Sequence, residues 1–256
     1  MIDARAIVSP QAQLAPDVTV GPFSIIGPQV QIGARTVIGP HVVVNGPTTI
    51  GEDNRIFQFA SIGDAPQDKK YRGEPTRLVI GDRNVFRESC TMNRGTTHDR
   101  GVTTIGNDNL FMAFSHVAHD CVIGNNTVFA NSVAMGGHVE VGDWAILGGL
   151  VAVHQFTKIG AHAFLGGGAI LSRDVPPYVM VAGNPAVPHG VNAEGLKRRG
   201  FSEEQVRHIR EAYRILYRSD LKLSEALARL TTLAAERLEI RAFVDFIHSS
   251  TRSLVR

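Results

Sequence analysis

The sequence predicts an all-β parallel β-helix over residues 1–191, followed by a small C-terminal α-helical domain over residues 192–256. Three observations lead to this prediction. An apolar residue recurs at every sixth position through most of the first part, glycine often follows it directly, and the pattern changes to helical periodicity near residue 192. The first two features are typical of short strands joined by tight corners, and the third is typical of packed amphipathic helices.

The period of six runs through three stretches of the chain, from Val8 to Ile62, from Ile80 to Met92 and from Ile105 to Leu171. Every in-phase position is apolar, although apolar residues make up only 43% of the sequence. Neither the period of a helix nor that of an ordinary strand explains this pattern. One inward aliphatic side chain per short strand does, if the small residue that follows it allows the corner. Three such sides close a coil of about 18 residues, and coils stack at about 4.8 Å by parallel strand pairing.

The repeat is interrupted at two places. Residues 63–78 carry the charged residues Asp68 and Glu74 at in-phase positions, so this segment leaves the coil as a loop. A second interval, which contains residues 94–103, is one residue longer than two hexads and indicates another loop. Loops on a rigid scaffold often contact substrates, and we expect this of the first loop. We interpret the second loop as a surface insertion.

The helical domain is predicted by its capping and periodicity. Ser202 and Gln205 form a capping box, and an amphipathic stripe runs from Val206 to Tyr217. Two further helices are expected around Leu227–Leu233 and Ile240–Ile247. Residues 193–256 have a net charge of +4, against −2 for the rest of the chain.

Composition excludes several classes of protein. A net charge of +2 does not suit a general nucleic-acid binder, which needs a clear excess of Lys and Arg. The longest apolar run, Trp144–Val153, has about half the length that a membrane-spanning helix requires. The N-terminal residues lack the features of a secretory signal, so we expect a cytoplasmic protein. Cys90 and Cys121 are expected to be buried free thiols in a reducing compartment.

Four histidines fall on consecutive coils of the predicted β-helix: His116, His119, His138 and His154. Any one of them could simply pack against a neighbour, but four within two or three coils favour a functional site. A zinc site is one interpretation. General-base catalysis is another, because Asp120 follows His119 and a carboxylate can fix the tautomer of an imidazole. No Ser or Cys motif accompanies the histidines, which disfavours nucleophilic catalysis.

Several motifs together resemble the UDP-N-acetylglucosamine O-acyltransferase family of hexapeptide-repeat acyltransferases, over the whole chain. They are PQDKKYRGEPTRLVIGDRN, HVAHDCVIGN, GGHVEVGDWAILGG, VHQF, DVPPYV and NAEGLKRRGFS. The resemblance implies a left-handed β-helix and a cytoplasmic homotrimer with sites between subunits. It implies transfer of a 3-hydroxyacyl chain from acyl carrier protein to the 3-hydroxyl of UDP-N-acetylglucosamine, the first step of lipid A biosynthesis. It implies no cofactor and no metal.

The same resemblance assigns roles to individual residues. His119 matches the general base, Asp120 the carboxylate that supports it, and Gly137 the backbone donor to the oxyanion. Gly167 matches the residue that limits acyl-chain length, with Phe164 nearby, and a glycine there implies a long chain. Ten residues match substrate contacts to the sugar, the phosphates and the nucleotide, and among them His154 matches a residue one layer away from the substrate. They are Asp68, Lys70, His116, His138, His154, Gln155, Asn192, Glu194, Arg198 and Arg199.

Other functions compete with this interpretation. Some members of the family acylate a 3-amino sugar nucleotide and form an amide, and Asn93 stands where the family often has histidine. The related acyltransferase that acts on a 2-amine carries an additional N-terminal domain, whereas the hexads of this chain begin at Val8. A metal-dependent β-helix hydratase and a non-catalytic scaffold are the remaining alternatives.

Overall fold

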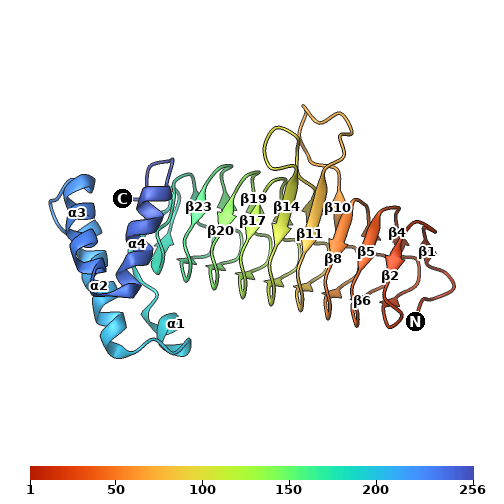
Figure 1. Cartoon of the computed structure of the whole chain (residues 1–256), viewed down its shortest axis with the longest axis horizontal. Helices are drawn as coiled ribbons and strands as arrows, with labels where there is room; N and C mark the ends of the chain where they lie inside the picture. The colour runs from red at the N-terminus through yellow and green to blue at the C-terminus, as the bar shows by residue number, and fades with distance from the viewer.

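The computed structural model describes residues 1–256 and has the predicted architecture of a parallel β-helix with helices at its C-terminal end (Figure 1). Three sheets run along the molecule, and each strand pairs in parallel with the strand one coil later. The one exception is the last pair, β26 and β27, which is antiparallel. No helix combines the length and hydrophobicity that a membrane crossing requires.

The strands follow one another around the coil, so each sheet takes every third strand. The first sheet consists of β1 Ile7–Val8, β4 Ile25–Ile26, β7 Val43–Val44, β10 Ser61–Asp64, β13 Thr91–Asn93, β16 His116–Val117, β19 Ala134–Met135, β22 Ala152–Val153 and β25 Ile170–Leu171. The second consists of β2 Gln13–Leu14, β5 Val30–Ile32, β8 Thr48–Ile50, β11 Arg77–Ile80, β14 Val102–Ile105, β17 Val122–Ile123, β20 Glu140–Val141 and β23 Lys158–Ile159. The third consists of β3 Thr19–Val20, β6 Val37–Ile38, β9 Arg55–Ile56, β12 Val85–Phe86, β15 Leu110–Phe111, β18 Val128–Phe129, β21 Ile146–Leu147, β24 Phe164–Leu165, β26 Val179–Ala182 and β27 Val187–Val191.

Most coil sides bury two residues, although the period of six indicated only one. The predicted aliphatic residue is buried, and so is a smaller or polar residue two positions before it, as in Ser24 with Ile26 and Asn54 with Ile56. Cys90 and Cys121 occupy this second row, and both are free and buried as expected. The Ser24 hydroxyl accepts the Val42 N–H of the next coil, and the Asn54 amide donates to the Gly81 carbonyl, so the burial of these two side chains leaves their hydrogen bonds intact.

The corners are built differently from the sequence-based prediction. The residues with positive φ lie three positions after the inward aliphatic residue, and most are not glycine; Phe23, Asp120 and His138 are examples. The glycine that directly follows the aliphatic residue serves the stacking of coils instead. A Cβ atom on Gly33 would lie 2.6 Å from the carbonyl carbon of Gly51 in the next coil. These glycines therefore let backbones approach, and the turn is made two residues later.

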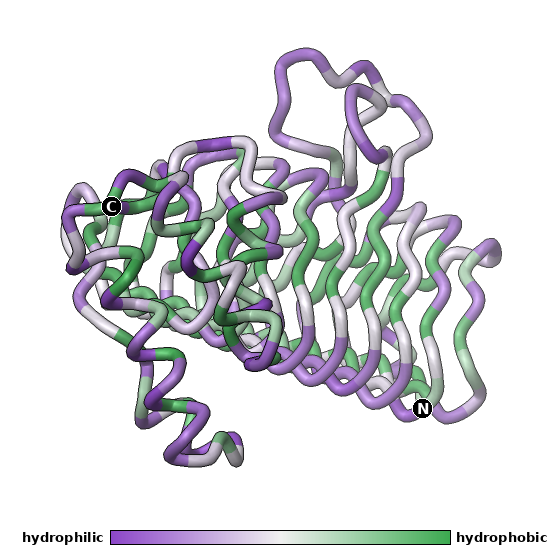
Figure 2. The backbone as a smooth tube through the Cα atoms, turned by 60° about the vertical axis from the view of Figure 1, so that its left-hand side comes forward, coloured by the Kyte–Doolittle hydropathy of each residue, from purple (hydrophilic) through white to green (hydrophobic).

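Both loops leave the β-helix at the same edge and project side by side (Figures 1 and 2). The first connects β10 to β11 and the second connects β13 to β14. Each thus interrupts the corner between the first and second sheets. Because successive coils are in register, the two loops rise from neighbouring coils over one corner.

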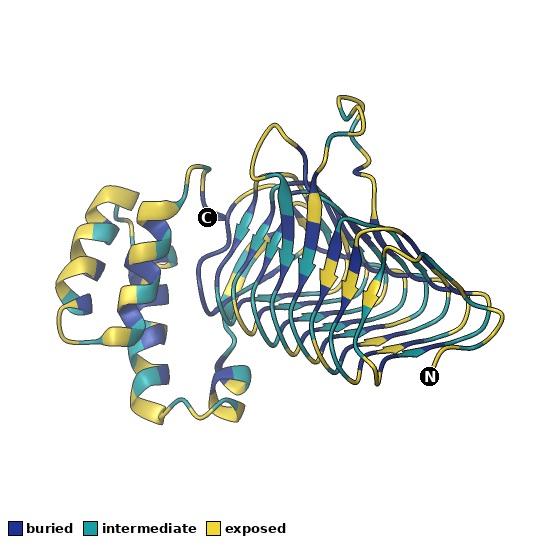
Figure 3. Ribbon diagram, turned by 45° about the vertical axis from the view of Figure 1, so that its right-hand side comes forward, coloured by how far each residue is buried: buried dark blue, intermediate teal, exposed yellow.

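Four helices complete the chain: α1 Ala193–Arg198, α2 Glu203–Tyr217, α3 Leu223–Ala234 and α4 Leu238–Ser249. The predicted capping box of Ser202 and Gln205 opens α2. Helices α2, α3 and α4 pack against one another through their buried faces and expose their outer faces (Figure 3). The last strand ends at Val191 and α1 begins at Ala193, next to the domain boundary we predict at 191/192.

Replacing Gly33 by alanine tests the stacking role of the glycines. The new Cβ would overlap the backbone of Gly51, so we expect Gly33→Ala to lower the free energy of unfolding by about 1–3 kcal/mol, as overpacking does. Gly149→Ala is the matched control, because its Cβ would meet only the Asn131 carbonyl oxygen at 3.4 Å. Chemical denaturation of the two variants measures the difference, and equal losses would contradict the stacking role.

Candidate active site

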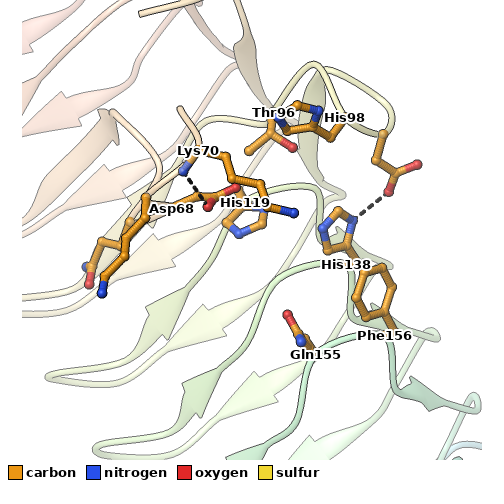
Figure 4. A pocket seen from close by; sticks show the side chains of 11 residues that line it. Asp68, Lys70, Thr96, His98, His119, His138, Gln155 and Phe156 are labelled. Carbon is orange, nitrogen blue, oxygen red and sulfur yellow. Dashed lines mark hydrogen bonds and ion pairs between the residues drawn. The ribbon is translucent and has the colours of Figure 1, made fainter. Parts of the chain in front are cut away.

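A cavity of about 780 Å³ lies where the two loops meet the corner between the first and second sheets (Figure 4). Its walls come from three sources: the first loop, the second loop, and the corners of successive coils. Ten of its eleven lining residues are polar or charged. They are Gln67, Asp68, Lys69, Lys70, Thr96, His98, Asp99, His119, His138, Gln155 and Phe156.

His119 and Asp120 form a hydrogen-bonded pair at the wall of this cavity. The distance from His119 Nδ1 to Asp120 Oδ2 is 2.9 Å. Asp120 is the positive-φ corner residue that follows β16, and its carboxylate bonds to the imidazole of the preceding residue. The carboxylate is fully buried, whereas 13% of the His119 side chain is exposed. The pair therefore presents the imidazole to the cavity and keeps the carboxylate from water.

The buried Asp120 carboxylate is held by several donors. Thr96 donates its backbone N–H at 3.0 Å and its hydroxyl at 2.7 Å, in addition to the bond with His119. Burial opposes ionisation, but the hydrogen bonds outweigh it, so the pKa of Asp120 lies below its ordinary value. Asp120 is thus a carboxylate at neutral pH and can fix the orientation of His119.

Gly137 lies against the face of the His119 ring. A Cβ atom at this position would be 2.5 Å from His119 Cε1 and 2.7 Å from Nε2, so only glycine leaves room for the imidazole. The Gly137 N–H makes no hydrogen bond within the chain, whereas its carbonyl accepts one from the Phe156 N–H. A free backbone donor therefore lies beside the imidazole.

His138 occupies the corner one coil after Asp120. Its Nδ1 lies 2.7 Å from Asp99 Oδ2, and its ring meets that of His119 edge-on, with 5.0 Å between centroids. Phe156, one coil further, stacks on His138 at 4.2 Å. Two histidines from adjacent coils are thereby held at one side of the cavity, as their spacing of one coil plus one residue predicted.

The loops supply the remaining polar groups. Asp68 and Lys70 come from the first loop, where the Asp68 carboxylate accepts the Lys70 N–H at 2.9 Å. The backbone N–H of Lys70 lowers the pKa of Asp68 most, and the Lys70 ammonium nearby lowers it further. Our interpretation of the second loop as a mere surface insertion is wrong. Thr96, His98 and Asp99 line the cavity because this loop rises from the same corner as the first.

Two of the four predicted histidines lie outside the cavity lining. His116 is on the outward face of β16, where its Nδ1 lies 2.7 Å from Thr91 Oγ1. Burial, and then the neighbouring His119, lower the pKa of His116. His154 follows β22, and its Nδ1 lies 3.0 Å from the Gln155 carbonyl oxygen. Gln155 itself lines the cavity.

The predicted nucleotide residues lie around α1, away from the cavity lining. Asn192 caps this helix by accepting the Gly195 N–H. Arg199 lies over the ring of Trp144 and contacts His162 Nδ1 at 3.2 Å. Trp144 and His162 belong to the corner between the second and third sheets, so this cluster and the cavity are on different corners of one chain.

The two predicted acyl-chain residues lie on yet another side. Phe164 points outward from β24 in the third sheet and is partly buried, whereas Gly167 is exposed at the corner between the third and first sheets. A Cβ on Gly167 would meet the Gly149 carbonyl oxygen at 3.3 Å. The outward face of the first sheet separates this corner from the cavity.

His119, Asp120 and His138 are also the residues that could hold a metal ion, since their ligand atoms lie within 4.8 Å of one another. Asp120 Oδ2, however, already accepts bonds from the Thr96 hydroxyl and from His119. His119 Nδ1 and His138 Nδ1 both face carboxylates rather than each other. This donor set fits a proton-transfer pair better than a coordination site.

Sequence reasoning missed Gln67, Lys69, Thr96, His98, Asp99 and Phe156 as lining residues. Phe156 could have been found, because Asp120, His138 and Phe156 are spaced by one coil of 18 residues each and must share a corner. The residues of the second loop carried no periodic signal. Only the closeness of both loops in space brings them to the cavity.

Comparison with known proteins identifies the family. A family profile described as "Udp N-acetylglucosamine O-acyltransferase; Domain 2" matches residues 174–255, and a bacterial transferase hexapeptide profile matches residues 11–46 and 103–137. Acyl-[acyl-carrier-protein]–UDP-N-acetylglucosamine O-acyltransferases from Thiobacillus denitrificans and Pseudomonas aeruginosa are 55% and 54% identical to the chain, covering 100% of it and 99% of each relative. The chain belongs to the UDP-N-acetylglucosamine O-acyltransferase family.

Solved structures agree with this membership. The UDP-N-acetylglucosamine acyltransferase of Francisella novicida superposes with a TM-score of 0.98 at 43% identity, covering 100% of this chain and 94% of that one. The O-acyltransferase of Moraxella catarrhalis gives a TM-score of 0.98 at 47% identity, covering 100% and 99%. The resemblance of the motifs to the acyltransferase family is thereby confirmed.

The cluster at Arg199 makes the stability of this acyltransferase dependent on pH. Burial, and then the neighbouring Arg199, lower the pKa of His162 to about 4 from an ordinary 6.5. Between these values the unfolded chain binds a proton that the folded chain does not, so stability falls as the pH drops below about 6.5. We expect a change from pH 7 to pH 5 to cost the wild type roughly 1 kcal/mol more than His162→Phe, which keeps the aromatic stacking. Urea denaturation at both pH values measures this, and parallel losses would contradict it.

Proposed function

We propose that the chain transfers a 3-hydroxyacyl group from acyl carrier protein to the 3-hydroxyl of UDP-N-acetylglucosamine, the first step of lipid A biosynthesis, with His119 as general base. The observation that carries the mechanism is the His119–Asp120 pair at the cavity wall with the free Gly137 N–H beside it. The relatives named above bear the name of this reaction. The enzyme is an O-acyltransferase.

The pair supplies the proton transfers. With Nδ1 bonded to the ionised Asp120, the neutral His119 ring carries its proton on Nδ1 and offers Nε2 to a substrate hydroxyl. His119 takes the proton as the sugar oxygen bonds to the thioester carbonyl carbon. The carbon–sulfur bond then breaks, and the imidazolium returns the proton to the departing thiolate of the carrier. Asp120 stabilises the imidazolium between these steps.

Gly137 suits the negative charge that develops on the carbonyl oxygen. Its N–H is unbonded and lies next to the imidazole, where the attacked carbonyl must come. A backbone donor that is already oriented loses nothing by reorganising when the charge forms. Asp68, Lys70, His138 and Gln155 surround the same space, so they are suited to hold the hydroxyls and phosphates of the sugar nucleotide.

A homotrimer would unite the two halves of this site. The cavity and the nucleotide residues around α1 lie on different corners of one chain. A ligand that contacts both the cavity and the nucleotide residues must therefore lie between two subunits. The third corner is an apolar ridge that favours contact between subunits: Phe23, Phe59, Phe114 and Leu150 are more than half exposed there. His116 and His154 then fall near a subunit boundary rather than in open solvent.

The acyl chain and its carrier have matching surfaces. Between the cavity and Gly167 the outward face of the first sheet carries the small or apolar residues Ala134, Ala152 and Ile170, which suit an alkyl chain. Helix α2 carries Arg207, Arg210 and Arg214 around a groove of about 460 Å³, in which the only carboxylate, Glu211, is paired with Arg237. This basic surface suits an acidic carrier protein. We place the reaction in the cytoplasm, in keeping with the two free thiols.

Product analysis tests the proposed function. Purified protein is mixed with UDP-N-acetylglucosamine and 3-hydroxyacyl carrier proteins of several lengths, and the product is identified by mass and by its lability to mild base. We expect an ester that forms equally well after chelation. His119→Gln and Asp120→Asn should lower kcat by about 10²–10⁴-fold, the usual contribution of general-base catalysis, while His189→Gln at an exposed position changes nothing. An amide product, loss of activity on chelation, or unchanged turnover in His119→Gln would each contradict the proposal.

Gly167 is expected to set the length of the acyl chain. Its Cα is exposed, and a side chain there would project from the corner into the path we assign to the chain end. A methionine side chain would block the last part of this path, and each CH₂ of the acyl chain that is no longer buried loses about 0.8 kcal/mol. Gly167→Met should therefore shift the preference by several methylene groups toward shorter chains. Competition between carriers of different chain length measures this. Phe164→Leu tests the neighbouring residue, and an unchanged preference in Gly167→Met would show that the limit lies elsewhere.

A further inference from the structure

The three residues Arg94, Gly95 and Thr96 connect strand β13 to the second loop and contact both halves of the cavity. Thr96 holds the Asp120 carboxylate, but the proposed proton-transfer steps give none of the three residues a part of its own. They follow directly on Asn93, the last residue of β13, and the segment is buried or partly buried throughout. Beyond joining a strand to a loop, these residues bond to Asp120 and to the first loop.

Thr96 holds the carboxylate that orients the general base. Its backbone N–H lies 3.0 Å from both oxygens of Asp120, and its hydroxyl donates to Asp120 Oδ2 at 2.7 Å. Only 2% of Thr96 is exposed. Because Oδ2 is also the atom that bonds to His119 Nδ1, the Thr96 hydroxyl fixes the very oxygen that sets the direction of the imidazole.

Gly95 allows this contact. A Cβ atom on it would lie 2.3 Å from the Val102 nitrogen and 2.8 Å from Asp120 Oδ1. A side chain would therefore push the segment away either from the start of β14 or from the catalytic carboxylate. The Gly95 N–H also donates to the Arg77 carbonyl at 3.2 Å, which ties the segment to the strand that ends the first loop.

Arg94 holds the loop that carries the sugar-binding residues. Its Nη1 donates at 2.6 Å to the carbonyl of Gly63, in β10 just before the first loop, and its Nη2 donates to the Tyr71 hydroxyl at 3.1 Å. Tyr71 in turn donates to the Glu74 carbonyl at 2.8 Å. The guanidinium thus spans the loop from its base to its middle, and Asp68 and Lys70 lie between these two points.

We propose that Arg94–Thr96 is the positioning segment of the active site: Thr96 orients His119 through Asp120, and Arg94 fixes the sugar-binding loop through Tyr71. The inference rests on the roles proposed above for His119, Asp68 and Lys70. Since all three residues of the segment are covalently joined, the base and the loop are set relative to each other by one short piece of backbone. The segment acts through other residues and touches no reacting atom.

The two ends of the segment have separable kinetic effects. Thr96→Val keeps the backbone donor and the shape of the side chain but removes the hydroxyl, so the base is less well oriented while sugar binding persists. We expect kcat to fall roughly 10-fold, the equivalent of one hydrogen bond to a charged group, with the KM for UDP-N-acetylglucosamine unchanged. Thr96→Ser should restore kcat. Thr97→Val, at the exposed neighbouring position, should match the wild type.

At the other end, Tyr71→Phe and Arg94→Gln release the first loop without touching Asp120. We expect the KM for UDP-N-acetylglucosamine to rise roughly 10-fold with kcat nearly unchanged. Arg77→Gln is the matched control, because Arg77 is exposed at the end of the same loop and its side chain makes no hydrogen bond. Direct titration with UDP-N-acetylglucosamine should show the same loss of affinity, and thermal unfolding identifies any variant that fails to fold.

The positioning role is overturned if Thr96→Val keeps wild-type kcat, if Thr96→Ser is as impaired as Thr96→Val, or if Tyr71→Phe lowers kcat and leaves KM unchanged. Where Arg94→Gln does not fold, Tyr71→Phe alone decides the second half. These outcomes differ from a failure of the proposed function, which is seen in the wild type as the absence of the ester product and in His119→Gln as unchanged turnover.

Discussion

Parallel hydrogen bonding between successive coils holds each residue next to its counterpart in the following coil, and the rest of the molecule depends on this register. Ile7, Ile25 and Val43 stand in one such row, and His116, Ala134 and Ala152 in its continuation. The inward aliphatic residues fill the interior at every step, so the register cannot slip without exposing them. Glycines such as Gly33 allow the backbones to approach closely enough for this pairing.

The same register creates the candidate active site. The corner between the first and second sheets repeats in every coil, so Asp120, His138 and Phe156 are stacked along it although they are far apart in the sequence. Both loops interrupt this corner on neighbouring coils and cover the stacked residues (Figures 1 and 4). A column of side chains beneath two loops thus combines candidate catalytic groups from the coils with candidate binding groups from the loops.

Periodicity predicted the β-helix and the two loops, and the adjacency of His119 and Asp120 in the sequence suggested their pairing, because each of these features depends on local spacing. It did not predict the second buried row, in which Ser24 and Asn54 lie, since polar residues in that row hide the pattern. Nor did it predict where Thr96 and Asp99 lie. Their contacts with Asp120 and His138 cross from one coil to a loop on another, and the sequence around them has no period.

The sequence by itself determined the fold, because one aliphatic residue in six is a constraint that only stacked coils satisfy. It also determined the family, through motifs spread over the whole chain. The tertiary structure decided how the candidate site is assembled: it put the second loop over the His119–Asp120 pair, held the Asp120 carboxylate with Thr96, and separated the cavity from Arg199. These relations depend on distances between coils and corners, which no spacing along the chain records.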